Sequence, residues 1–222
     1  MVGRGRRRRQ RAAWAAAVWG LCLVAADGTR AETAASLWDR LAPPANQAKP
    51  GPWAVHVYTG KLLDNYMTQI HYAPWKTRWT SATIVGVNVH RRILTLWKYL
   101  DLEIEIGGAR RLQERAWEVH AALTVRWDGF FWNDWVYTTV AISPLGPSYT
   151  DKVPYWEQVY VDFSKKTGRL ANVFSTELTL ALPEYRNYPL VFRIHHRSQI
   201  FGLNGGNENA SSFATIGFRI HF

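Results

Sequence analysis

The stretch "AWEVHAALTVRW", residues 116–127, alternates apolar and polar side chains along most of its length. One face would carry Trp117, Val119, Ala121, Leu123, Val125 and Trp127, and the other Glu118, His120, Thr124 and Arg126. A period of two residues is typical of a β-strand whose two faces meet different environments. The stretch therefore predicts a strand that is apolar toward one medium and polar or charged toward the other.

The same period begins at Trp53 and continues to the last residue, and no helical pattern of useful length interrupts it. It predicts strands at 53–58, 82–90, 94–106, 116–127, 135–143, 172–182, 190–198 and 212–222. The connections alternate in length, with short ones at 91–93, 128–134 and 183–189 and long ones at 59–81, 107–115, 144–171 and 199–211. Tight turns at one end and longer loops at the other are typical of outer-membrane barrels.

We therefore predict an all-β fold, an eight-stranded antiparallel transmembrane β-barrel of the outer-membrane type over residues 53–222. Tryptophans gather near the predicted strand ends, where a membrane interface would lie: Trp75, Trp79, Trp117, Trp127, Trp132, Trp135 and Trp156. The predicted inner face carries both signs of charge, and we expect ion pairs there: Asp101, Glu103, Glu105, Glu118, Arg126, Glu177, Arg193 and Arg219. The competing fold is a soluble lipocalin-like barrel, which would place its apolar face inside.

The N-terminal leader predicts export of the chain. A basic run precedes an apolar stretch shorter than the ~20 residues of a membrane span, and small residues follow. Cleavage after Ala26 or Ala31 fits this pattern; the second gives a signal peptide of residues 1–31, followed by a periplasmic segment and linker of residues 32–52. The only cysteine, Cys22, lies in the leader, so the mature chain has no disulfide or thiolate metal site.

The leader also explains most of the net charge of +10. It holds seven of the 27 basic residues and one of the 17 acidic ones, which leaves 20 basic against 16 acidic residues in the rest. This balance argues against a nucleic-acid-binding protein.

A candidate site lies in "RIHHRSQIFGLNGG", residues 193–206. His196 and Ser198 continue the parity of Phe192 and Ile194, so both side chains are expected on the lipid face. If the last strand ends in the periplasm, the strand before it, 190–198, ends near the outer leaflet. There a serine activated by a histidine could attack an ester. The alternative is that the two residues are ordinary polar side chains at a strand end.

The stretch "FRIHHRSQIFGLNGG…ATIGFRIHF" resembles the C-terminal strands of the lipid A 3-O-deacylase (PagL-type) family of outer-membrane enzymes. "HVYTGKLLDN" and "GPSYTDKVPYWE" resemble that family's first strand and long external loop, and the terminal "ATIGFRIHF" resembles the assembly signal of outer-membrane proteins. The resemblance implies an eight-stranded barrel in the bacterial outer membrane. It also implies an ester hydrolase that deacylates lipid A of lipopolysaccharide without a metal or other cofactor.

Matched to the family position by position, His196 is the general base, Ser198 the nucleophile and Glu208 the orienting acid. Gln199 stands where the family usually has Asn. Two alternatives remain open at this point: a non-catalytic outer-membrane barrel with a structural or surface-interaction role, and a soluble exported lipid-binding barrel. The sequence also leaves the oligomeric state open, a homodimer included.

Overall fold

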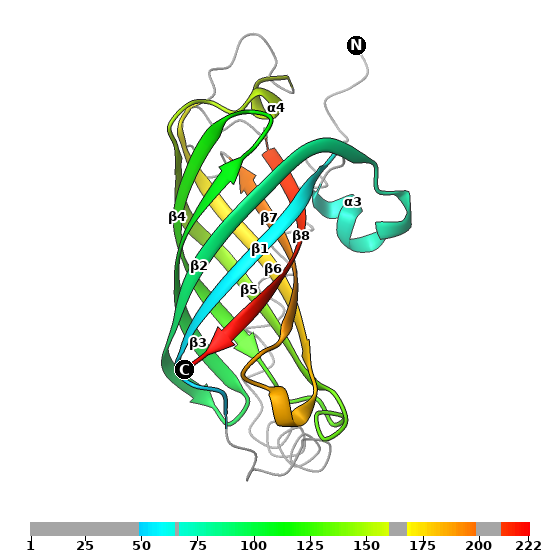
Figure 1. Cartoon of the computed structure of the whole chain (residues 1–222), viewed down its shortest axis with the longest axis vertical. Helices are drawn as coiled ribbons and strands as arrows, with labels where there is room; N and C mark the ends of the chain where they lie inside the picture. The colour runs from blue at the N-terminus through cyan, green and yellow to red at the C-terminus, as the bar shows by residue number, and fades with distance from the viewer. Residues whose placement is uncertain (1–48, 65–66, 160–167, 199–209) are drawn as a thin grey trace, which may run out of the picture. The chain divides into compact units, whose positions relative to one another are not determined.

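The fold is a closed antiparallel barrel, seen in a computed structural model that describes residues 49–64, 67–159, 168–198 and 210–222. Each of the eight strands found there pairs with its neighbours in sequence, and β1 pairs with β8 to close the barrel (Figure 1). The strands are β1 (Trp53–Leu63), β2 (Trp79–Trp97), β3 (Leu100–Arg111), β4 (Ala116–Trp127), β5 (Tyr137–Thr150), β6 (Leu170–Ala181), β7 (Leu190–Ser198) and β8 (Ala210–His221). The predicted all-β, eight-stranded antiparallel barrel is confirmed.

In the residues that the structure describes, helices are short and confined to the connections between strands. They are α3 (Met67–Tyr72), the 3-10 helix η2 (Pro74–Lys76), α4 (Tyr155–Val159) and the 3-10 helix η3 (Pro183–Tyr185). Both α3 and α4 lie at one end of the barrel, and the C-terminus lies at the other (Figure 1). No helix in the described part of the chain is long and apolar enough to cross a membrane. The predicted signal peptide, 1–31, and residues 32–48 of the predicted linker lie outside the described residues.

The first hairpin turns later than the sequence predicts. Residues 91–93, predicted as a turn, continue β2, and the chain turns at 98–99 instead. The two-residue turn places Trp97 opposite Leu100, but the ladder shifts register between Thr95 and Trp97. The shift offsets the turn, so Leu94 pairs with Leu102 on the outer face and the alternation stays in phase. The alternation of apolar and polar residues therefore does not indicate the position of this turn.

The connection predicted over 107–115 is also shorter in the structure, since β3 and β4 extend to a turn at 112–115. This turn uses Arg115, whose φ of 51° lies in the left-handed region.

Strand β5 continues through two prolines that the prediction assigned to a loop. The ladder between β5 and β6 shifts register between Ser143 and Gly146, which accommodates Pro144. Pro147 lies where the ladder between β4 and β5 is interrupted, between Ile142 and Ser148. Gly146 is required here, because a Cβ at this position would lie 1.9 Å from the backbone oxygen of Ala121 on β4. The long connection predicted at 144–171 is thereby reduced to 151–169.

The barrel interior is filled by paired charges, as the sequence predicts. Glu177 accepts hydrogen bonds from Arg126, Arg193 and Arg219, each at 2.8 Å. Arg193 also donates to Glu105 at 2.6 Å. All five side chains are buried. Because a buried charge costs several kcal/mol unless it is paired, these ion pairs are a condition for the closed barrel.

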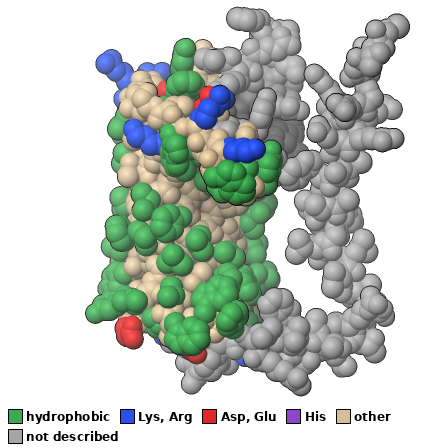
Figure 2. All heavy atoms as spheres, turned by 90° about the vertical axis from the view of Figure 1, so that its right-hand side faces the viewer, with side chains coloured by type: hydrophobic (Ala, Val, Ile, Leu, Met, Phe, Trp, Pro, Cys, Tyr) green, Lys and Arg blue, Asp and Glu red, His purple; other side chains and the backbone are tan. Residues whose placement is uncertain are grey.

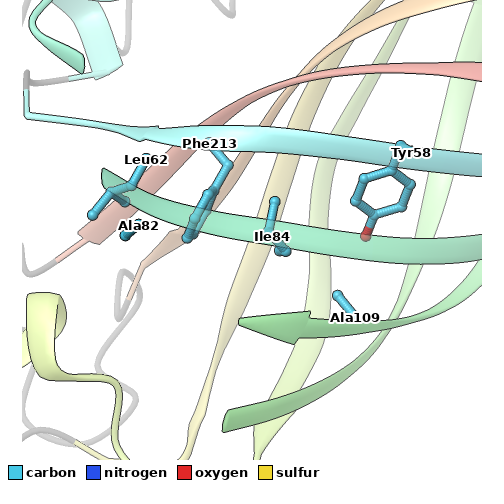
Figure 3. Packing of buried hydrophobic residues seen from close by; sticks show 6 residues of the cluster. All are labelled: Tyr58, Leu62, Ala82, Ile84, Ala109 and Phe213. Carbon is cyan, nitrogen blue, oxygen red and sulfur yellow. The ribbon is translucent and has the colours of Figure 1, made fainter. Parts of the chain in front are cut away.

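An apolar cluster lies inside the barrel near the end that carries α3 and α4 (Figure 3). It consists of Tyr58, Leu62, Ala82, Ile84, Ala109 and Phe213, from strands β1, β2, β3 and β8. Trp156 of α4 packs against it. The interface position predicted for Trp156 is therefore wrong, since its side chain packs against the interior cluster.

The outer surface is apolar, the reverse of a lipocalin-like barrel. Figure 2 shows hydrophobic side chains spread over one side of the barrel, with Lys and Arg gathered at one end. Large side chains exposed on the strands include Val57, Ile106, Leu123, Ile142 and Phe218. Of the predicted interface tryptophans, Trp75, Trp79, Trp117 and Trp135 are more than half exposed. A surface this rich in apolar side chains is suited to lipid.

We predict that Glu177→Ala lowers the free energy of unfolding by about 3–5 kcal/mol, because it leaves three arginines buried without their shared carboxylate. Urea unfolding in detergent micelles, followed by tryptophan fluorescence, measures this. Glu184→Ala, which removes an exposed carboxylate in η3, is the control and should leave the midpoint unchanged. Equal midpoints for Glu177→Ala and the wild type would contradict the dependence on ion pairs.

Candidate active site

His196 and Ser198 lie at the end of β7, at the same end of the barrel as α3 and α4. Their neighbours point inward: His195 Nε2 lies 2.8 Å from a Glu118 oxygen, and Arg197 donates to Ser148 at 3.1 Å. Because successive residues of a strand face opposite sides, His196 and Ser198 face outward. The adjacent histidines 195 and 196 therefore lie on opposite sides of the wall and cannot share one ligand.

The outward-facing pair is nevertheless buried, with 4% of His196 and 3% of Ser198 exposed. Phe174 of β6 flanks His196 in an edge-on contact, with ring centroids 6.4 Å apart. Helix α3 crosses the outside of the wall nearby, since Nε2 of His71 lies 3.1 Å from the hydroxyl of Thr176 on β6. The site therefore lies in a covered part of the outer wall, beside an aromatic ring.

Among the described residues, the hydrogen-bond partner of His196 is on β8. Its Nδ1 lies 2.8 Å from Oγ of Ser212, the residue directly opposite in the β7–β8 ladder. Ser212 is also buried, at 3% exposure. The sequence analysis missed this residue, because the register between the last two strands depends on the length of the loop that joins them.

Glu208, the orienting acid that the resemblance implies, and Gln199 lie outside the described residues. The structure therefore describes two of the three predicted site residues and puts them on one strand face. It adds Ser212 beside them. An imidazole held by a hydroxyl through Nδ1, with a second serine two residues along, has the parts of a serine nucleophile and its general base.

The inner side of the same strand ends is anchored by Glu157 of α4. Arg197 donates a hydrogen bond to Glu157, and Ser211 Oγ donates to it at 2.8 Å. Arg111 of β3 forms an ion pair with the same carboxylate at 3.2 Å. Arg197 lies between His196 and Ser198 in the chain, and Ser211 precedes Ser212. These hydrogen bonds and this ion pair on the inner face fix the backbone that carries the outward-facing site.

Two other groups of histidines and carboxylates lie inside the barrel. Their ligand atoms fall within 4.8 Å of one another: His56, His90 and Glu177 in one, and Glu118, His120 and His195 in the other. Arginines already bind both carboxylates, three at Glu177 and Arg111 at Glu118. A metal ion would meet these guanidinium charges at close range, so we assign neither group to the site.

No protein-family model matches this chain, and no curated protein matches it. The crystal structure of the outer-membrane enzyme PagL matches it over 76% of this chain and 99% of the other, with 12% identity and a TM-score of 0.53. Neisserial surface protein A matches with 10% identity and a TM-score of 0.45 over 79% and 100% of the two chains. The N-terminal barrel of Pseudomonas aeruginosa OprF matches with 11% identity and a TM-score of 0.43, over 78% of this chain and 100% of the other. At such identities the likeness to PagL shows the fold alone: this chain is an eight-stranded barrel similar to those of outer-membrane proteins.

We predict that Glu157→Ala loosens the ends of β7 and β8, because Arg197 and Ser211 lose the carboxylate that joins them to α4. Amide hydrogen exchange at residues 195–198 and 211–213 should accelerate by about tenfold or more, corresponding to ~1.4 kcal/mol in local opening. Gln158→Ala, an exposed neighbour on α4, is the matched control. If both variants exchange at the wild-type rate, Glu157 does not anchor these strand ends.

Proposed function

We propose that this chain is an esterase of the bacterial outer membrane that removes an ester-linked acyl chain from lipid A of lipopolysaccharide. Ser198 is the nucleophile and His196 the general base. The observation that carries the proposal is the buried, hydrogen-bonded His196 on the outward face of an apolar barrel, with Ser198 on the same face. A polar pair facing lipid is costly unless it is satisfied or used, and intramembrane titratable groups are functional candidates for that reason.

The position of the pair supports an outer-leaflet substrate. It lies at the end of the barrel opposite the C-terminus (Figure 1). If the C-terminus lies in the periplasm, as in the topology predicted from the sequence, the covered pair lies at the level of the outer leaflet. Phe174 beside His196 offers an apolar contact for an acyl chain. A soluble lipid-binding role is disfavoured by the apolar outer surface.

Cations near the same end suit an anionic glycolipid. Lys76 and Arg78 are exposed in the connection that follows α3, and Lys61 is exposed near the end of β1. Figure 2 shows the gathering of Lys and Arg at this end. Positive side chains bordering the membrane attract phosphate groups, which lipid A carries on its sugars.

The chemistry requires no metal or other cofactor. With Nδ1 of His196 engaged by Ser212, Nε2 accepts the hydroxyl proton of Ser198 as Oγ bonds to the ester carbon. The tetrahedral intermediate collapses when His196 returns that proton to the departing sugar oxygen, which leaves an acyl-serine. Water, deprotonated by His196, then releases the fatty acid and restores Ser198.

The first test is mass spectrometry of lipid A from cells that express the wild type or Ser198→Ala. We expect loss of one acyl chain with the wild type. Purified Ser198→Ala should lose at least about 10³-fold in rate on lipid A in mixed micelles. Thr59→Ala, which removes an outward-facing hydroxyl on β1, is the control and should retain activity.

Full activity of Ser198→Ala would overturn the assignment of the nucleophile. Unchanged lipid A, with the wild type folded in the outer membrane, would instead favour a non-catalytic barrel. One observation already favours that alternative: the partner of His196 within the described residues is a neutral hydroxyl rather than a carboxylate.

A further inference from the structure

We propose that Ser212 is the positioning residue of this site: its hydroxyl holds His196 through Nδ1, so that Nε2 is the nitrogen that serves Ser198, two residues along the same strand face. The inference rests on the proposed function, and it names a residue that the resemblance does not. Its geometric basis is the 2.8 Å separation between Nδ1 and Oγ, formed between two residues paired directly across the β7–β8 ladder.

The orientation of Ser212 is fixed by its two neighbours. Ser211 points inward, where its hydroxyl donates to Glu157 and accepts from Arg111 at 3.0 Å. Phe213 also points inward and is fully buried in the apolar cluster (Figure 3). Strand alternation then leaves Ser212 on the outer face. Because the inner contacts hold both flanking residues, the backbone of Ser212 is held in place and its side chain faces His196.

The hydrogen bond has a consequence for the tautomer of His196. A neutral imidazole carries its proton on one nitrogen and a lone pair on the other. If Ser212 accepts the proton of Nδ1, then Nε2 is the basic nitrogen, which is the state required to deprotonate Ser198. In the opposite tautomer Nε2 carries the proton and His196 cannot serve as the base. The proposal therefore assigns Ser212 the role of acceptor from Nδ1, which favours the tautomer that is competent for the first step.

A hydroxyl differs from a carboxylate in one respect. It can orient the imidazole, but it adds no negative charge to stabilise the imidazolium that forms during the reaction. The loss of Ser212 should therefore cost less than the ~10⁴-fold that follows loss of the correct tautomer in a carboxylate-containing triad. We expect a decrease in kcat of roughly 10-fold to 100-fold for Ser212→Ala, with KM little changed.

The test compares Ser212→Ala, Ser212→Thr and the control Thr59→Ala in detergent micelles. The first readout is the nitrogen NMR spectrum of the His196 ring, assigned with His196→Gln, because it reports the tautomer without any need for activity. We expect the Nδ1–H form in the wild type and in Ser212→Thr, which keeps the hydroxyl, and a shift toward the other tautomer in Ser212→Ala. The second readout is kcat on lipid A, which Ser212→Thr should keep within about threefold.

Each outcome bears on a separate statement. A His196 tautomer that is the same in the wild type and Ser212→Ala overturns the role of Ser212, whatever the activity. An inactive wild type that shows the expected change of tautomer supports the role of Ser212 and counts against the proposed function alone. If Ser212→Ala abolishes deacylation while Ser198→Ala does not, Ser212 is the nucleophile and the positioning role is overturned.

Discussion

The shared carboxylate of Glu177, bound by three arginines in the barrel interior, is the interaction on which the rest of the structure depends. Charges enclosed by eight strands must be paired, because the interior is too narrow for bulk water to solvate them. Once the polar face of each strand points inward, the alternation of side chains places the other face outward. The apolar outer surface and the outward position of His196 and Ser198 both follow from this alternation.

The sequence predicts the barrel well because the two faces of each strand differ so strongly in polarity. The prediction of strand ends fails where the alternation continues across a turn, and where prolines interrupt it within a strand. The alternation stays in phase across the turn at 98–99, because the register shift between Thr95 and Trp97 offsets the two-residue turn. Pro144 and Pro147 suggest a loop, but β5 accommodates them where its ladders to β4 and β6 are irregular. Those errors move strand ends by several residues without changing which faces are polar.

In the candidate site, too, the sequence predicts the local features and not those that depend on strand register. The outward direction of His196 and Ser198 follows from parity alone, which is a local property of β7. The pairing of His196 with Ser212 is not local, because it depends on the register between two strands joined by residues 199–209. Sequence spacing directs attention to carboxylates after Ser198, and Glu208 is the only one. A serine among several serines and asparagines carries no comparable signal until the ladder is known.

The contact between His71 and Thr176 joins residues 105 positions apart and reaches from the β1–β2 connection to β6. The barrel closes where β1 pairs with β8, so β8 and β7 lie between the strand that α3 follows and the strand that it contacts. In the closed barrel, α3 therefore lies across the seam at which β1 meets β8, and the outer wall near His196 is covered by a segment that precedes β2 in the chain.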